Sequence, residues 1–187
     1  MKKRVLTALL ILTEIFLLSA SIVWAQDAPV AKTGQTTSYA TGDDGDLQKG
    51  VASPDPRFID YGDGTVLDSK TGLMWARDAN MAGTTMTWAD AIDYANNITL
   101  GVSCSGEHTD WRLPDRFELE SLLDLGNIGP VLPSGHPFLN ALSTNYWSST
   151  TYAGVTNSAW DVSMLNGYVK HNFKTNDYYV WPVRGGN

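Results

Sequence analysis

Cysteine is almost absent from the sequence: Cys104 is the only one among 187 residues. An internal disulfide is therefore excluded, because it needs two thiols. In an oxidising compartment a lone thiol is buried and inert, paired with another chain, or reactive, and burial is the interpretation that we favour. A nucleophilic role would need a histidine and a third group beside the thiol, which the sequence does not indicate.

Histidine is scarce as well, with His108, His136 and His171 in three separate segments. Zinc normally takes at least one pair of closely spaced ligands, and no such His–His or His–Cys spacing occurs. We therefore expect no metal site and no cofactor. Calcium has candidate ligands only in the aspartates around the first expected hairpin, for which turn geometry is the simpler explanation: Asp60, Asp63 and Asp68.

Positive charge is also in short supply. The chain has 13 lysines and arginines against 20 aspartates and glutamates, a net charge of −7. Three of the basic residues, Lys2, Lys3 and Arg4, stand at the very start. Binding to nucleic acid or to an anionic membrane needs clustered positive charge, so neither is an expected partner.

The first 25 residues predict an export signal. The basic start is followed by an apolar run from Val5 to Val23, and Ala25 is the small residue that a signal peptidase prefers. Glu14 interrupts the run, which disfavours a stable membrane span. We expect cleavage after Ala25, no span afterwards, and a periplasmic, extracellular or cell-surface location, the alternative being a retained N-terminal anchor.

Residues 26–56 have the composition of a flexible acidic linker. They contain Asp, Gly, Thr, Ser, Ala, Lys and Pro with almost no large apolar side chain, which leaves too little surface to bury. The cluster Asp43-Asp-Gly-Asp46 lacks the ligand spacing of a calcium loop. We interpret it as part of the solvated linker.

From residue 57 to 187 the sequence predicts one folded domain, in which six of the seven tryptophans occur. Short strands are expected over 58–60, 65–67 and 73–75, joined by turns rich in glycine and aspartate. Further strands are expected over 145–150, 159–164, 168–173 and 178–184. In the second of these, alternation places Trp160, Val162 and Met164 on one face, and Asn166-Gly167 predicts the hairpin turn that follows. Pro182 predicts an edge or interrupted final strand.

Two helices are expected between these groups of strands. Thr87 begins the first, whose apolar positions Trp88, Ala91, Ile92 and Ala95 share one face up to Asn96-Asn97. The second follows Pro114, with Asp115 and Glu118 spaced as a capping box, and is expected to end near Gly126. The crowded charges of this stretch, HTDWRLPDRFELESLLD, therefore indicate a helix start and its ion pairs rather than an acid–base active site.

Six segments, FIDYGDGTVLDSKTGLMWAR, TWADAIDYANNITL, DWRLPDRFELESLLD, YWSSTTY, AWDVSMLNGYV and VWPVRGG, resemble in their order the C-terminal domain of Legionella collagen-like protein. More remotely, the Arg-Leu-Pro-x-x-x-Glu-Leu pattern resembles formylglycine-generating enzymes and other C-type-lectin-like folds. The resemblance implies an α+β, C-type-lectin-like domain, with two helices packed on a twisted antiparallel sheet of many short strands. Its structural motif residues are Asp110, Trp111, Arg112, Pro114, Asp115, Glu118, Trp147 and Arg184.

The chain departs from these resemblances at informative places. Many relatives carry two cysteines where this sequence has Ala95 and Trp181, so that bridge is missing and packing must supply the stability. Formylglycine-generating chemistry needs more cysteine than Cys104 provides. The Glu-Pro-Asn or Gln-Pro-Asp loop and the Trp-Asn-Asp triplet of calcium-dependent lectins are missing as well.

We expect a non-enzymatic recognition or adhesion module that binds a glycan or a surface protein. Relatives at the ends of surface adhesins bind polyanionic glycans, but the acidic charge here favours a neutral glycan or a protein. An enzyme with an unrecognised site and a self-associating envelope protein are the alternatives. Aromatics beside polar side chains suit recognition, and the candidate ligand-binding residues are Tyr152, Asn157, Asn176, Asp177 and Tyr178.

Overall fold

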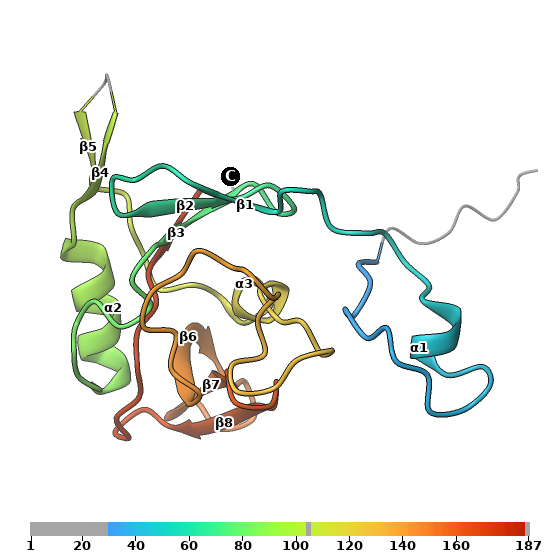
Figure 1. Ribbon diagram of the computed structural model, residues 1–187. Coiled ribbons are helices and arrows are strands. Elements are labelled where there is room, and N and C mark those ends of the chain that lie inside the picture. Colours follow the sequence, from blue (N-terminus) through green and yellow to red (C-terminus); the bar gives the residue numbers. More distant parts are fainter. Residues whose placement is uncertain (1–29, 104–105, 186–187) are drawn as a thin grey trace, which may run out of the picture.

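The computed structural model describes residues 30–103 and 106–185. In this part of the chain the structure is mixed α/β, mostly short strands in small antiparallel sheets, with three short helices (Figure 1). One sheet has the order β1-β2-β3-β9, another is the hairpin β4-β5, and the third has the order β6-β7-β8. The expected mixture of helices and many short antiparallel strands is confirmed.

The bounds of the elements are α1 Asp44–Leu47, β1 Phe58–Asp60, β2 Thr65–Asp68, β3 Leu73–Ala76, α2 Trp88–Asn97, β4 Leu100–Ser103, β5 Gly106–His108, α3 Arg116–Ser121, β6 Asn145–Thr151, β7 Ser158–Ser163, β8 Val169–Phe173 and β9 Val183–Arg184.

Aspartates shape the turn between β1 and β2. Gly62 and Gly64 have φ angles of 74° and 91°, a region that residues with a Cβ rarely adopt. Asp60 accepts a hydrogen bond from the N–H of Gly62, and Asp63 accepts one from the N–H of Thr65. Turn geometry thus explains both carboxylates, as expected.

Asp68 is fully buried and forms an ion pair that joins two parts of the domain. Its Oδ2 lies 2.8 Å from Nη2 of Arg57, and Nε of Arg57 donates to its other oxygen. The same guanidinium donates to the carbonyl of Ser121 at the end of α3. Arg57 therefore connects the first sheet to α3, which the sequence did not indicate.

Helix α2 forms as the sequence predicts. Thr87 is its N-cap, and Ala91 and Ala95 are fully buried on its inner face. Trp88 and Ile92 are half-buried and pack against the same apolar cluster. The helix thus covers one flank of the domain with the face that its periodicity indicated (Figure 1).

In the middle of the chain one expectation was wrong, and one hairpin had not been predicted. Helix α3 ends at Ser121 rather than near Gly126, because the backbone turns so that the N–H of Asp124 donates to the carbonyl of Val131. The hairpin β4-β5 was not foreseen. At Gly101 in this hairpin φ is 79°, and a Cβ would lie 2.9 Å from side-chain atoms of both Thr65 and His108, so a glycine is required.

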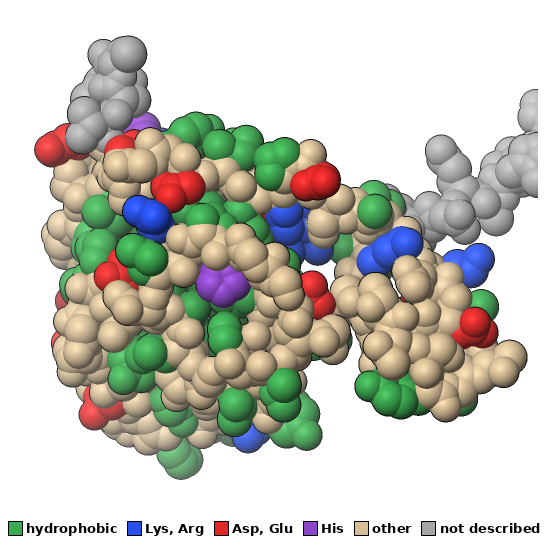
Figure 2. Space-filling view, in the orientation of Figure 1, with side chains coloured by type: hydrophobic (Ala, Val, Ile, Leu, Met, Phe, Trp, Pro, Cys, Tyr) green, Lys and Arg blue, Asp and Glu red, His purple; other side chains and the backbone are tan. Residues whose placement is uncertain are grey.

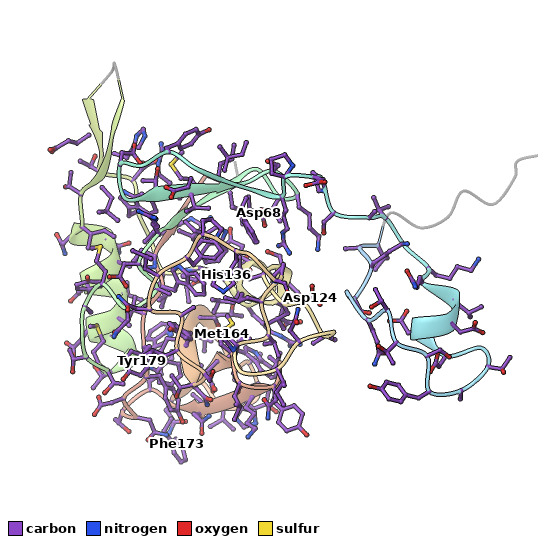
Figure 3. The ribbon with its side chains drawn as sticks, in the orientation of Figure 1. Asp68, Asp124, His136, Met164, Phe173 and Tyr179 are labelled. Atoms are coloured by element: carbon purple, nitrogen blue, oxygen red, sulfur yellow. The ribbon has the colours of Figure 1, made fainter. Side chains whose placement is uncertain are left out.

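The core is aromatic and lies between the first and third sheets. Trp181 packs edge-on against Trp75 at 5.7 Å and against Phe138 at 4.8 Å between ring centroids, and donates its indole N–H to the carbonyl of Ala76. Met164 is buried in the same cluster (Figure 3). Trp181 thus fills with apolar surface a position for which the family resemblance implies a cysteine.

Pro182 interrupts the last strand, as expected. Tyr178 and Tyr179 form isolated bridges to Met86 and Tyr146, and only β9 beyond the proline pairs with β3. The carbonyl of Pro182 still accepts a hydrogen bond from the N–H of Ala76, whereas the proline has no N–H to donate.

The described part of the predicted linker forms a small lobe beside the domain, visible at the right of Figure 2. Asp43 caps α1, and a bridge joins Ala31 to Val51. The lobe contacts the domain where the N–H of Leu125 donates to the carbonyl of Thr33. Flexibility of the linker stays a prediction, and the expected signal segment, residues 1–25, and Cys104 lie outside the described residues. In residues 30–103 and 106–185 no helix has the length and apolarity needed to cross a membrane.

Candidate functional site

The charged stretch before α3 is a helix start, as its spacing predicts. Asp115 accepts a hydrogen bond from the N–H of Glu118 at 2.8 Å, and Glu118 accepts one from the N–H of Asp115 at 2.7 Å. This reciprocal pair is a complete capping box, and both carboxylates lie at the positive end of the helix.

Ion pairs then fix the loop before α3 to the end of the chain. Arg112 donates to both oxygens of Glu118, at 2.7 and 2.6 Å, and also to the carbonyl of Gly185. Arg184 donates to Asp110 at 2.7 Å, and this hydrogen bond lowers the pKa of the Asp110 carboxyl. Asp110, Arg112, Glu118 and Arg184 thus each have a structural partner.

The apolar residues of this motif are buried. Trp111, Pro114 and Trp147 have little or no exposure, and the indole N–H of Trp147 donates to the carbonyl of Met86. The motif also holds the third sheet, since the N–H of Ser149 on β6 donates to the carbonyl of Pro114.

A cluster of rings reaches the surface beside the third sheet, and we call Tyr152, Trp160 and His171 the aromatic cluster. The rings of Tyr152 and His171 are stacked at 4.0 Å with an interplanar angle of 12°. Trp160 meets both rings edge-on, at 5.3 and 5.7 Å. Because His171 is exposed and the other two are half-buried, part of the cluster is open to a ligand.

Cations lie over two half-buried tryptophans. The guanidinium of Arg116, in the first turn of α3, is 4.4 Å from the ring centroid of Trp160. The ammonium of Lys174 lies 3.8 Å from the ring centroid of Trp88, which is on α2, and donates to the hydroxyl of Thr151. These contacts hold the polar side chains against the sheet and leave N–H groups beside the aromatic rings.

The predicted ligand-binding residues do not all come together. Tyr152 lies in the aromatic cluster. Asn157 is exposed, and its backbone carbonyl accepts a hydrogen bond from the N–H of Lys174, where the turn after β8 begins. Asn176 and Asp177 lie in that turn, one half-buried and the other exposed. Tyr178 is half-buried and packs on Trp147, 4.7 Å between centroids, so it is partly a core residue.

Sequence reasoning missed Trp160 and His171 as surface residues. Trp160 was expected on one face with Val162 and Met164, and those two are fully buried whereas Trp160 is not. In the structure the N–H of Ser163 donates to the carbonyl of Tyr168 across a loop of residues 164–167, so Trp160 and His171 are cross-strand partners. A two-residue turn at Asn166-Gly167 would have paired His171 with Val162, so no signal in the sequence brings the two rings together.

Asp161 lies beside the cluster in sequence but points into the protein. It is fully buried, and its two oxygens accept hydrogen bonds from the amides of Asn145 on β6 and Asn172 on β8, each at 2.7 Å. Burial raises the pKa of the Asp161 carboxyl, against the opposing effect of the amides. The carboxylate thus cross-links all three strands of the sheet and has no route to a substrate.

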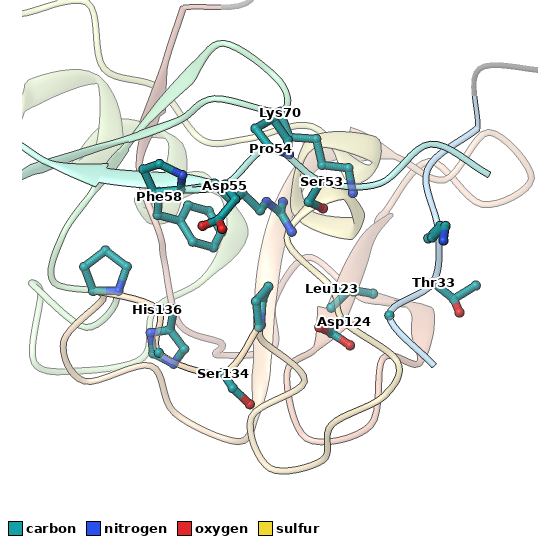
Figure 4. Close-up of a pocket in the computed structure, with 17 residues that line it drawn as sticks. Thr33, Ser53, Pro54, Asp55, Phe58, Lys70, Leu123, Asp124, Ser134 and His136 are labelled. Atoms are coloured by element: carbon teal, nitrogen blue, oxygen red, sulfur yellow. The ribbon is translucent and has the colours of Figure 1, made fainter. Parts of the chain in front are cut away.

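A hollow lined by side chains of both charges lies between the N-terminal lobe and the domain, and has a volume of about 350 Å³. In Figure 4, Lys70 and Asp55 lie on one side of it, and His136, Ser134 and Asp124 on the other. Burial, reinforced by nearby Arg57, lowers the pKa of Lys70, and burial lowers the pKa of His136. At the lobe side of the hollow, the hydroxyl of Thr33 donates a hydrogen bond to the carboxylate of Asp44.

The three histidines remain apart in space. His108 ends β5, His136 lies in the loop before Phe138, and His171 lies on β8. Among the residues that the structure describes, no three His, Cys, Asp or Glu side chains come together in a way that could hold a metal ion.

A family model described as the Lcl C-terminal domain matches residues 64–184 of the chain. No curated protein matches the sequence. The matched range contains both flanking helices, the capped loop before α3 and the aromatic cluster.

Proposed function

The chain belongs to the Lcl C-terminal domain family, and we propose that it is an exported, non-enzymatic recognition module that binds a neutral glycan on the aromatic cluster. Membership of this family indicates a surface-associated domain. The proposal adds a periplasmic or cell-surface location, which rests on the export signal that the first 25 residues predict.

We also assign the domain a C-type-lectin-like architecture. Strands from the two ends of the domain, β1 and β9, belong to one sheet, and α2 and α3 flank the strands. This agrees with the closely spaced ends and the two helices that the family resemblance implies.

The stacked, partly exposed rings of the aromatic cluster carry the glycan proposal. Sugar rings pack on aromatic surfaces through their C–H faces, and hydroxyls need polar partners nearby. Arg116 provides N–H groups beside Trp160, and His171 offers the exposed ring of the stacked pair. The net charge of −7 favours a neutral glycan over a polyanionic one.

Capture of neutral oligosaccharides by the full chain on a glycan array, followed by titration calorimetry, tests the proposal. His171→Ala should weaken binding by roughly fivefold without unfolding the exposed strand, since an aromatic contact contributes about 1 kcal/mol. Tyr61→Ala is the matched control, because Tyr61 is an exposed ring on the distant first turn. Equal affinities of the two variants, or no saturable capture by the wild type, would contradict the assignment.

The non-enzymatic and export parts have their own measurements. Incubation of a captured glycan with the protein should release no product, and accumulation of product would show an enzyme instead. Intact mass of the protein recovered outside the cytoplasm should correspond to a chain beginning at Gln26. A mass that retains residues 1–25 would instead support the N-terminal anchor.

A further inference from the structure

Strand β8 is the outer strand of the third sheet and lies at the lower margin of the molecule (Figure 1). Two hydrogen bonds define which of its residues face β7. The N–H of Ser163 donates to the carbonyl of Tyr168, and the N–H of Lys174 donates to the carbonyl of Asn157. Both bonds belong to the continuous β7-β8 register, so the even-numbered residues from 168 to 174 direct their backbone groups inward.

The odd-numbered residues therefore direct their backbone groups away from the sheet. These are Val169, His171 and Phe173, and within the described ranges none of their N–H groups has a hydrogen-bond acceptor. The carbonyls of Val169 and His171 have no donor there either. Phe173 is 56% exposed and is seen at the outer edge in Figure 3. Five alternating donors and acceptors thus form an edge that an extended chain could pair with.

One exposed lysine on this edge has no carboxylate partner in an otherwise acidic protein. In the part of the chain that the structure describes, Lys170 forms no ion pair, and its ammonium lies 5.5 Å from the ring centroid of Tyr168. The ammonium of Lys174 instead lies over Trp88 and donates to Thr151 on β6, so it does not serve this edge. Two copies of β8 placed edge to edge would bring their Lys170 side chains together, and like charges across strands are destabilising. A strand that carries carboxylates would be stabilised at the same positions.

We propose that the open edge of β8 binds an extended acidic peptide, which adds to the third sheet as a fourth strand. Backbone groups of Val169, His171 and Phe173 would provide the hydrogen bonds. Lys170 would pair with a carboxylate of the peptide, whose alternate side chains point to one face. This surface adjoins the aromatic cluster at His171, but it uses the backbone of β8 and Lys170 rather than the rings.

A capped eight-residue peptide of alternating Glu and Thr, labelled with fluorescein, is a direct probe for the full chain. Fluorescence anisotropy should show saturable binding that weakens as salt is raised. The same peptide N-methylated at every second residue keeps its charge but loses donors, and should bind at least tenfold more weakly. A Lys-Thr peptide of the same length should not bind. Equal binding of the methylated and unmethylated peptides would overturn strand addition, since charge alone would then suffice.

The variants Phe173→Pro and Phe173→Ala isolate the backbone contribution. Both remove the exposed ring, but only proline removes the outward N–H, and the inward ladder bonds are left in place. Phe173→Pro should bind the peptide roughly three- to tenfold more weakly than Phe173→Ala, the effect of one lost hydrogen bond. If Phe173→Pro fails to fold, the methylated peptide still tests the wild type. Equal peptide affinities of the two folded variants, or a peptide-induced dimer seen by light scattering, would refute the proposal. Neither outcome would contradict the glycan proposal.

Discussion

Glu118 should contribute more to stability than a helix cap alone. In Glu118→Ala the reciprocal capping bond disappears, which typically costs about 1 kcal/mol. The two hydrogen bonds from Arg112 disappear as well, and a half-buried guanidinium loses its carboxylate. Hydrogen bonds to charged groups are individually worth about 1.5–3 kcal/mol when buried, and solvent at Arg112 reduces this value. We therefore expect a total loss of about 2–3 kcal/mol, or roughly 10 °C in the melting temperature.

Urea unfolding of the full chain, followed by tryptophan fluorescence, measures this loss. Glu118→Gln keeps an acceptor for the N–H of Asp115 but removes the charge, so it should lose about 1 kcal/mol. Exposed Glu107 provides the control, and Glu107→Ala should stay within about 0.5 kcal/mol of the wild type. A Glu118→Ala variant as stable as this control would refute the reasoning.

The pH dependence of the same measurement separates charge from capping. Burial alone would raise the pKa of Glu118, but hydrogen bonds from Arg112 and the Asp115 N–H outweigh it, and the pKa is lowered from its usual 4.5. The stabilisation is therefore present above the unfolded-state pKa and is lost as the pH falls through the lower pKa of the folded state. Glu118→Gln should lack this acid-sensitive increment, and identical pH profiles would contradict the ion pair.

Three further outcomes follow from buried or closely packed groups. Asp161→Ala should destabilise the domain by about 2–4 kcal/mol, because it leaves two asparagine amides without acceptors. The pKa of the Asp161 carboxyl is raised by folding, so its contribution to stability is lost as the pH rises through the folded-state pKa, and Asp161→Asn should flatten the dependence of unfolding on pH there. Arg57→Ala should cost about 3–5 kcal/mol in chemical unfolding, since Asp68 would remain fully buried without its partner. Gly34→Ala should detach the N-terminal lobe, because the added Cβ would lie 1.9 Å from Oδ1 of Asp124. We expect faster proteolysis before residue 56 at an unchanged melting temperature, and unchanged proteolysis would contradict the docking of the lobe.

The local elements were largely readable from the sequence. The turns around Gly62 and Gly64, the start of α2 at Thr87 and the capping box at Asp115 depend on contacts within a few residues, so local chemistry determines them. The end of α3 depends on a hydrogen bond to Val131, and helix periodicity contains no information about that partner.

The surface was harder to predict than the core. Alternation placed Trp160, Val162 and Met164 on one face, of which the structure buries Val162 and Met164 but not Trp160. A period of two says which side chains share a face and not how far along that face the core extends. Helix α3 covers only part of the sheet, and Trp160 lies where Arg116 of its first turn forms the border.

The sequence by itself determined the family, the helix starts and the turns, since each follows from residues close together or from a motif in fixed order. Only the tertiary structure decided that Tyr152 stacks on His171, that Arg57 pairs with Asp68, and that β8 is left at an edge. These features join segments that are distant in sequence or depend on which strand has no neighbour. The spacing of residues in the sequence encodes neither the contacts between distant segments nor the position of a strand at a sheet edge, because both depend on how the sheets pack together.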